Sequence, residues 1–215
     1  MLDRVQCVSL PRSGHNLLVS HLQKYFRPAS MCKKNRYRLL QFGTRSNSEK
    51  TPTDLGFHYC EYYYACRSHP CIEARNTFQK SHDFDLLLPL QADQKYLIQK
   101  RKPLDLLISW FEMRLLKGRE KDTPEGFSQF VNRMRPYVDG FRQKWIDAPM
   151  QHRLVFDYNS YLETPAQHLR AAVLYFDDTL DIDMNRIEEI VSDVKPAKDN
   201  RKFRYIDTAP TRNCA

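Results

Sequence analysis

The sequence predicts a three-layer α/β/α fold built around a central parallel sheet. Short apolar segments with strand character alternate along the chain with longer segments that carry apolar residues at helical spacing. The first strand, residues 5–10, runs into a helix through a turn of small and charged residues. The 215 residues, 41% of them apolar, suffice for one such domain with a sizeable core. We expect a single domain over residues 1–215 that binds ligands outside the carboxyl ends of its strands.

The first half of the chain supplies three expected strands, at residues 5–10, 76–80 and 95–100, which have apolar or alternating character. The helix after the first strand has one apolar face, formed by Leu18, Leu22 and Tyr25. Residues 59–71 are rich in aromatic residues and cysteine, and for them we expect a short helix.

Helices dominate the middle of the chain. Pro103 suits the first turn of a helix. The apolar stripe of that helix is formed by Leu104, Leu107, Ile108, Phe111 and Leu115. A second helical region is expected from Thr123 to about Ala148, with Pro136 and Gly140 as candidate breaks.

The last part of the chain continues the alternation. Residues 153–158 have the apolar character of a strand. Residues 164–167, with the sequence Thr-Pro-Ala-Gln, match a capping-box helix start. A final helix is expected within residues 183–194, with one face formed by Met184, Ile187 and Val191.

The charge balance favours an anionic partner. Lysine and arginine number 34 against 26 aspartates and glutamates, which leaves a formal charge of +8. Residues 27–56 are rich in basic and polar residues, so we expect either a mobile loop or lid over the site or a solvated insertion without function. Residues 195–215 form a basic tail. No stretch resembles a signal sequence or a membrane span, so we expect a cytoplasmic protein.

The cysteines are expected to be reduced thiols, because six of them occur without a secretory signal. Cys60, Cys66 and Cys71 cluster with His58 and His69, as in some zinc sites. The spacing contains no C-x-x-C or H-x3-H pair of the kind that zinc knuckles use. We therefore expect no metal site.

The turn at residues 11–16 has the composition of an anion-binding loop. Free backbone N–H groups at a helix N-terminus point into one space, and the helix dipole adds partial positive charge there. Arg12 adds a full positive charge. The turn lacks the lysine and the second glycine of a Walker A motif, which argues against an ATPase or an ordinary kinase.

Residues 11–17, with the sequence Pro-Arg-Ser-Gly-His-Asn-Leu, resemble the 5′-phosphosulfate loop P-[KR]-S-G-T-T-W of the PAPS-dependent sulfotransferases, where PAPS is 3′-phosphoadenosine 5′-phosphosulfate. This resemblance implies a fold like that of the P-loop NTPases. It also implies that the loop binds the 5′ end of PAPS through Arg12, Ser13, Gly14, His15 and Asn16. In this chain His15, Asn16 and Leu17 replace T-T-W, so phosphate-contacting hydroxyls and an adenine-stacking aromatic are missing.

A second segment resembles the 3′-phosphate element of that family. Arg101, Pro103, Asp105 and Ser109 reproduce the spacing of its Arg, Pro, Asp and Ser. Arg101 leaves the end of a strand as a fixed cation, and Ser109 offers a hydroxyl one to two turns into the next helix. The resemblance implies that Arg101 and Ser109 hold the 3′-phosphate.

A third segment, Lys80-Ser81-His82, resembles the K-[TS]-H segment of the cytosolic-type enzymes. The resemblance implies that His82 removes the proton of the acceptor, while Asp83 orients His82 or is itself the base. Lys80 and Arg12 would then stabilise charge on the transferred group.

Two further matches lie later in the chain. Residues 156–165 resemble the YEDL-x-x-x-P strand and turn, which implies that Tyr158 approaches the adenine, although packing alone would also explain a tyrosine there. Arg201 and Lys202 resemble the late R-K-G clamp of the 3′-phosphate, with Arg204 as an alternative.

Together these matches imply transfer of a sulfuryl group from PAPS to an acceptor hydroxyl or amine, with PAP as the product and no metal. The acceptor would be a small molecule or a glycan, and no nucleic-acid partner is expected. One alternative is a divergent P-loop kinase or nucleotide hydrolase, which would depend on ATP and Mg²⁺. Another is a basic nucleic-acid-binding module built from residues 27–45, the tyrosines at 62–64 and the basic tail.

Overall fold

The computed structural model describes residues 2–26, 57–62, 68–73, 76–192 and 194. The expected lid at residues 27–56 lies outside the described residues, as does the basic tail with Arg201 and Lys202.

The centre of the molecule is a sheet of five parallel strands in the order β2-β3-β1-β4-β5. The strands are β1 (Val5–Ser9), β2 (Tyr59–Glu61), β3 (Phe78–Ser81), β4 (Lys95–Lys100) and β5 (Arg153–Asp157). Val5 of β1 is in register with Phe78 of β3 and with Lys95 of β4. Because all the strands run the same way, their carboxyl ends meet at one edge of the sheet, where ligands bind in folds of this class.

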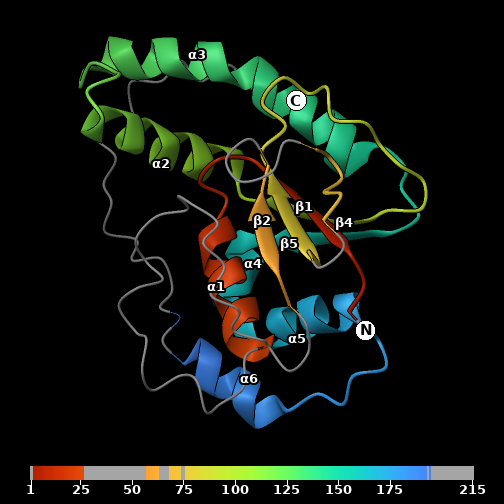
Figure 1. The fold of residues 1–215 in the computed structure, drawn as a ribbon. Helices are drawn as coiled ribbons and strands as arrows, with labels where there is room; N and C mark the ends of the chain where they lie inside the picture. Colours follow the sequence, from red (N-terminus) through yellow and green to blue (C-terminus); the bar gives the residue numbers. More distant parts are fainter. Residues whose placement is uncertain (1, 27–56, 63–67, 74–75, 193, 195–215) are drawn as a thin grey trace.

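Helices cover both faces of the sheet, as Figure 1 shows. The helices are α1 (His15–Phe26), α2 (Pro103–Leu116), α3 (Pro124–Phe141), the π-helix η2 (Arg142–Asp147), α4 (Tyr158–Glu163), α5 (Pro165–Phe176) and α6 (Met184–Val191). One apolar core joins the sheet to α1, α5 and α6, and a second joins the opposite face to α2, α3 and η2. The expected three-layer α/β/α architecture is therefore confirmed.

Two local expectations at the ends of strands were wrong. Residues 59–61 form a strand, not a helix, because they pair with β3. Their sequence, Tyr-Cys-Glu, is too short for its periodicity to indicate this pairing. Tyr158 does not continue β5 but begins α4, because the Asp157 side chain accepts hydrogen bonds from the N–H groups of Asn159 and Ser160 and so caps that helix.

The helix α3 runs without a break through Pro136 and ends only where η2 begins at Arg142. Gly140 lies within the helix, and a Cβ atom on it would lie 2.6 Å from the Cδ1 atom of Leu86. This glycine therefore lets the loop after β3 pass close against α3.

The expected apolar faces of two helices and the expected cap of a third need correction. In α2, Leu104 is 47% exposed, whereas Leu106 and Trp110 are buried. In α6, Met184 is exposed and Ile190 is buried, so the buried face is shifted. The α5 helix begins at Pro165 without a side-chain cap from Thr164, so the capping-box expectation was wrong.

Cys60 and Cys71 pack together in a small buried cluster. In the described part of the chain, no three His, Cys, Asp or Glu side chains are grouped so that they could hold a metal ion, and Cys66 lies outside that part. Among the same residues, no helix is both long enough and apolar enough to cross a membrane.

Candidate functional site

The turn between β1 and α1 folds into an open loop through two residues in the left-handed region of backbone space. Arg12 has φ of 68° and Gly14 has φ of 88°. Between them the buried Ser13 donates a hydrogen bond from Oγ to the Leu10 carbonyl, at 2.7 Å, which fixes the turn. A Cβ atom at position 14 would lie 2.0 Å from Cδ2 of Tyr158, so only glycine fits beneath that ring. The N–H groups of Leu17 and Leu18 donate to the Gly14 carbonyl, which leaves those of His15 and Asn16 at the start of α1 suited to an anion.

Four of the residues that the sequence singled out for the donor are linked to one another by contacts. The Nε of Arg12 lies 3.2 Å from the Oγ of Ser109 on α2. The Nη1 of Arg101 donates to the Arg12 carbonyl at 3.2 Å, and its guanidinium carbon lies 5.0 Å from the centre of the Tyr158 ring. We call Arg12, Arg101, Ser109 and Tyr158 the guanidinium cluster. Two cations and a hydroxyl at one place form a site suited to a phosphate.

His82 lies beyond the carboxyl end of β3, next to the end of β1. Its Nδ1 is 2.8 Å from the carbonyl oxygen of Ser9 and 3.3 Å from the Ser9 hydroxyl. A carbonyl only accepts hydrogen bonds, so the proton is on Nδ1 and the lone pair is on Nε2. Burial, with the Lys80 cation acting in the same direction, lowers the pKa of His82 to about 4. His82 is therefore a neutral imidazole at neutral pH that can accept a proton through Nε2.

Lys80 lies one strand position from the end of β3, and its side chain is buried. Its Nζ forms an ion pair with Oε1 of Glu61, at 2.9 Å. Glu61 ends β2 and also accepts a hydrogen bond from the Tyr59 hydroxyl. The sequence did not single out Glu61, because residues 59–71 were expected to be helical and nothing in their spacing indicates a partner for Lys80.

The side chain of His15 turns into the interior. Its Nδ1 lies 3.3 Å from the Sγ of Cys7, and its ring is stacked on Phe78 with the ring centres 5.9 Å apart. Burial lowers the pKa of His15 well below its ordinary value, and the charges of Lys80 and His82 add to this effect. Because its ring is held in the interior, His15 can bind an anion with its backbone N–H and not with its side chain. Asn16, in contrast, is exposed.

Asp83 is not placed to be the base. Its side chain is completely buried, and its Oδ2 accepts hydrogen bonds of 2.7 Å from both Lys144 and Trp145. Its Oδ1 accepts from the N–H of Leu88, at 2.9 Å. Asp83 also does not orient His82 through a bond to its Nδ1, because that atom is bonded to Ser9.

The site therefore has two parts at one edge of the sheet. The guanidinium cluster lies where β1, β4 and β5 lead into α1, α2 and α4, and His82 and Lys80 lie at the end of β3 on the other side of β1. The anion-binding loop joins the two parts. Arg201 and Lys202, expected to clamp the 3′-phosphate, lie outside the described residues.

No protein-family model matches the chain, and no curated protein matches it. Among solved structures, the crystal structure of mouse sulfotransferase SULT7A1 complexed with PAP superposes with a TM-score of 0.58 at 14% identity. The match covers 90% of this chain and 65% of the mouse chain. A sulfotransferase from Alicyclobacillus acidocaldarius matches with a TM-score of 0.44 at 14% identity, over 88% of this chain and 90% of that one. The first match shows that the chain has the P-loop-like fold of a sulfotransferase.

Proposed function

We propose that the chain transfers a sulfuryl group from PAPS to an acceptor hydroxyl or amine and releases PAP. The observation that carries the proposal is the contact between Arg12 and Ser109, which joins the anion-binding loop to the segment that resembles a 3′-phosphate element. The neutral His82 at the neighbouring strand end supplies a group that can accept a proton. The fold, shared with a sulfotransferase crystallised with PAP, supports the same activity.

The residues present fit a donor with two anionic ends. The loop at residues 12–16 offers backbone N–H groups and the start of a helix dipole to the 5′-phosphosulfate. Arg101 and Ser109 would bind the 3′-phosphate, with Arg12 between the two ends because its side chain already contacts Ser109. Tyr158, stacked beside the Arg101 guanidinium, would contact the nucleoside. Holding both ends of the donor fixes the direction in which its sulfur faces the acceptor.

In the transfer step, an oxygen or nitrogen of the acceptor forms a bond to sulfur. The bond between sulfur and the bridging oxygen breaks, and the electron pair leaves with PAP. The acceptor's proton passes to Nε2 of His82, which is unprotonated because Nδ1 carries the ring proton. Lys80 would supply positive charge near the transferred oxygens, in the role that a metal ion has in phosphoryl transfer.

The acceptor, a small molecule or a glycan, and a cytoplasmic location are parts of this proposal that rest on the sequence alone. Sugar, phenol, lipid and peptide hydroxyls all fit the chemistry of the step.

A comparison of melting temperatures with PAP, AMP, ATP with Mg²⁺, and a short oligonucleotide tests the proposal. A ligand that binds only the folded state raises the melting temperature, and at equal concentration the tighter ligand raises it more. We expect the largest rise with PAP. A larger rise with ATP that needs Mg²⁺ would indicate a kinase or hydrolase, and a salt-sensitive rise with the oligonucleotide that PAP does not displace would indicate a nucleic-acid-binding protein.

A further inference from the structure

The loop that follows His82 is tied to the end of the α3–η2 segment by one buried carboxylate. The carboxylate is that of Asp83, which accepts from Nζ of Lys144 and from Nε1 of Trp145, each at 2.7 Å. Nζ of Lys144 also donates to the carbonyl oxygens of Leu86 and Leu88, each at 2.7 Å. An ammonium group has three protons to donate, so Lys144 has a partner for every one of them. We call Asp83, Lys144 and Trp145 the Asp83 clamp.

The π-helix accounts for the clamp's shape. Neighbouring residues of an α-helix point about 100° apart, which separates their side chains. The π-helical turn is wider, and π-helical segments occur often at functional sites. Because Lys144 and Trp145 both lie in η2, two consecutive side chains can reach the same carboxylate oxygen.

The clamped loop has an unusual backbone. Asp83 has φ of 44° and Leu86 has φ of 58°, values that residues with a side chain seldom adopt. Such conformations persist where the surroundings enforce them, and they cluster at functional sites. The loop also lies close to α3, since a Cβ atom at position 140 would lie 2.6 Å from the Cδ1 atom of Leu86.

Stability alone does not account for the clamp. Removing two charges from water costs free energy that their attraction barely repays, so a buried ion pair is often no better than apolar side chains of the same volume. The three side chains hold the backbone of Asp83 in one position, and with it the backbone of His82, the residue before it.

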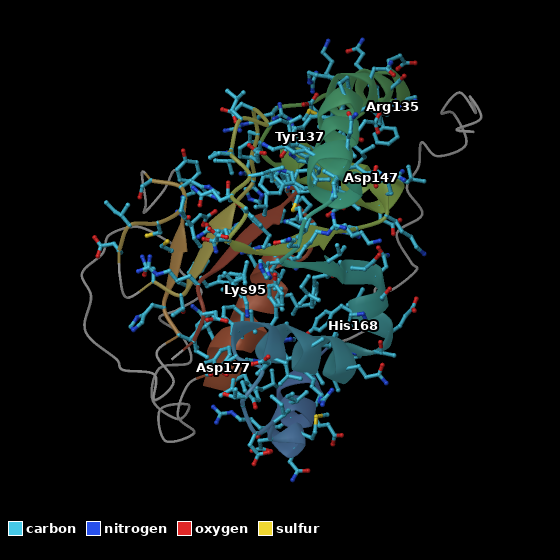
Figure 2. All side chains as sticks on the ribbon, turned by 90° about the vertical axis from the view of Figure 1, so that its right-hand side faces the viewer. Lys95, Arg135, Tyr137, Asp147, His168 and Asp177 are labelled. Carbon is cyan, nitrogen blue, oxygen red and sulfur yellow. The ribbon has the colours of Figure 1, made fainter. Side chains whose placement is uncertain are left out.

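His82 is held on three sides. The Tyr137 hydroxyl of α3 donates to the His82 carbonyl oxygen at 2.6 Å. The His82 ring is bonded through its Nδ1 to Ser9 of β1. The peptide that follows His82 is anchored through the Asp83 clamp to η2. Figure 2 shows Tyr137 and Asp147 near each other on the α3–η2 side of the molecule, apart from His168 and Asp177 on the side of α5.

We propose that Asp83, Lys144 and Trp145 are positioning residues that hold His82 with its Nδ1–H on the Ser9 carbonyl and its Nε2 left to receive the acceptor's proton. This inference rests on the proposed function for the role of His82. The clamp itself touches neither the donor loop nor the guanidinium cluster among the described contacts.

The test compares two clamp variants with a matched control. Trp145→Phe keeps a ring in the core but removes the bond to Oδ2 together with part of the buried indole, and Asp83→Asn keeps the shape and removes the charge. Arg142→Met is the control, because Arg142 lies in the same π-helix and pairs with Asp147 at 3.3 Å, but its side chain is 68% exposed. Each protein is prepared with ¹⁵N-labelled histidine, the His82 signals are assigned with a His82→Gln variant, and the position of the ring proton is measured without ligand.

We expect one tautomer, with the proton on Nδ1, in the wild type and in Arg142→Met, and a mixture of tautomers in both clamp variants. In transfer assays with PAPS we expect kcat to fall about 10- to 100-fold in the clamp variants, the scale of a displacement of about 1 Å, while KM for PAPS changes less than about threefold. The Asp83→Asn protein could fail to fold, and in that case Trp145→Phe decides.

A clamp variant that folds and keeps both the single tautomer and the wild-type kcat overturns the inference. The tautomer measurement, made without ligand, tests the positioning of His82 independently of the proposed sulfotransferase activity. If the tautomer changes as expected but the wild type transfers no sulfuryl group and binds no PAP, the positioning of His82 stands and the sulfotransferase proposal fails.

Discussion

The Nε of Arg12 lies 3.2 Å from the Oγ of Ser109, although 97 positions separate the two residues in the chain. This contact makes one site of two segments that the sequence presents separately. Arg101 adds a second guanidinium by donating to the Arg12 carbonyl. An anion bound at this place would meet two cations and a hydroxyl, and that combination distinguishes the site from a simple phosphate loop.

Gly14→Ala tests the loop. The new methyl group would overlap the Tyr158 ring, and alanine is strained at φ of 88°. We expect a loss of about 2–3 kcal/mol in the free energy of unfolding, measured with denaturant, and loss of PAP binding. Gly118→Ala is the control, because Gly118 has φ of 63° but nothing lies within 4 Å of the added atom. The control should lose about 1 kcal/mol from backbone strain and bind PAP normally. Equal effects of the two changes would contradict the close packing of Tyr158 on the loop.

His82→Ala separates chemistry from donor binding. The ring contacts Ser9 and lies next to β1, not in the guanidinium cluster. We therefore expect kcat to fall about 10²- to 10⁴-fold, the usual contribution of a general base, while the Kd for PAP stays within about threefold. Transfer at the wild-type rate would mean that another group accepts the proton.

The stability of the fold should depend on pH through its buried histidines. The pKa values of His69 and His82 are lowered from 6.5 to about 4, mainly by burial. Between pH 4 and pH 6.5 the unfolded chain binds more protons than the folded one. The contribution of these histidines to the free energy of unfolding is therefore fully present above pH 6.5 and is lost as the pH falls towards 4. For His82 the shift corresponds to about 3 kcal/mol.

Melting temperatures measured from pH 7 to pH 4.5 check this expectation. His82→Gln removes one of the shifted groups and should flatten the dependence. A wild-type melting temperature that stays constant over this range would contradict the low pKa values.

Glu61→Gln should destabilise the fold, because it leaves the buried Lys80 ammonium without its counter-ion. Breaking a buried ion pair costs about 3 kcal/mol when one charge remains. The double variant Glu61→Gln with Lys80→Met should recover most of this loss in denaturant unfolding, since no charge is then left unpaired. A double variant no more stable than Glu61→Gln alone would show that the pairing with Lys80 is not the cause.

The sequence predicted the parts of the fold that depend on local pattern. The β1–loop–α1 unit, the strands β3, β4 and β5 and the helix after Pro103 follow from apolar periodicity and turn residues. Arg101 and Ser109 were expected to bind one phosphate together because their segment resembles the 3′-phosphate element of the sulfotransferases.

What the sequence did not indicate depends on contacts between distant segments. The three-residue strand β2 exists because β3 pairs with it, and Glu61 becomes the partner of Lys80 only through that pairing. The bonds of Asp83 to Lys144 and Trp145 span 61 and 62 positions, so nothing near Asp83 in the sequence shows that its carboxylate is occupied.

The central claim is that Arg101 and Ser109 bind a 3′-phosphate while the loop at residues 12–16 binds the 5′ end. Calorimetric titration of PAP and of AMP into the wild type and Arg101→Ala tests it most directly, since the two ligands differ only in the 3′-phosphate. Loss of a charge-assisted hydrogen bond costs about 1.5–3 kcal/mol. We expect Arg101→Ala to weaken PAP about 10- to 100-fold and AMP less than about threefold. An equal loss for both ligands, or no preference of the wild type for PAP over AMP, would contradict the claim.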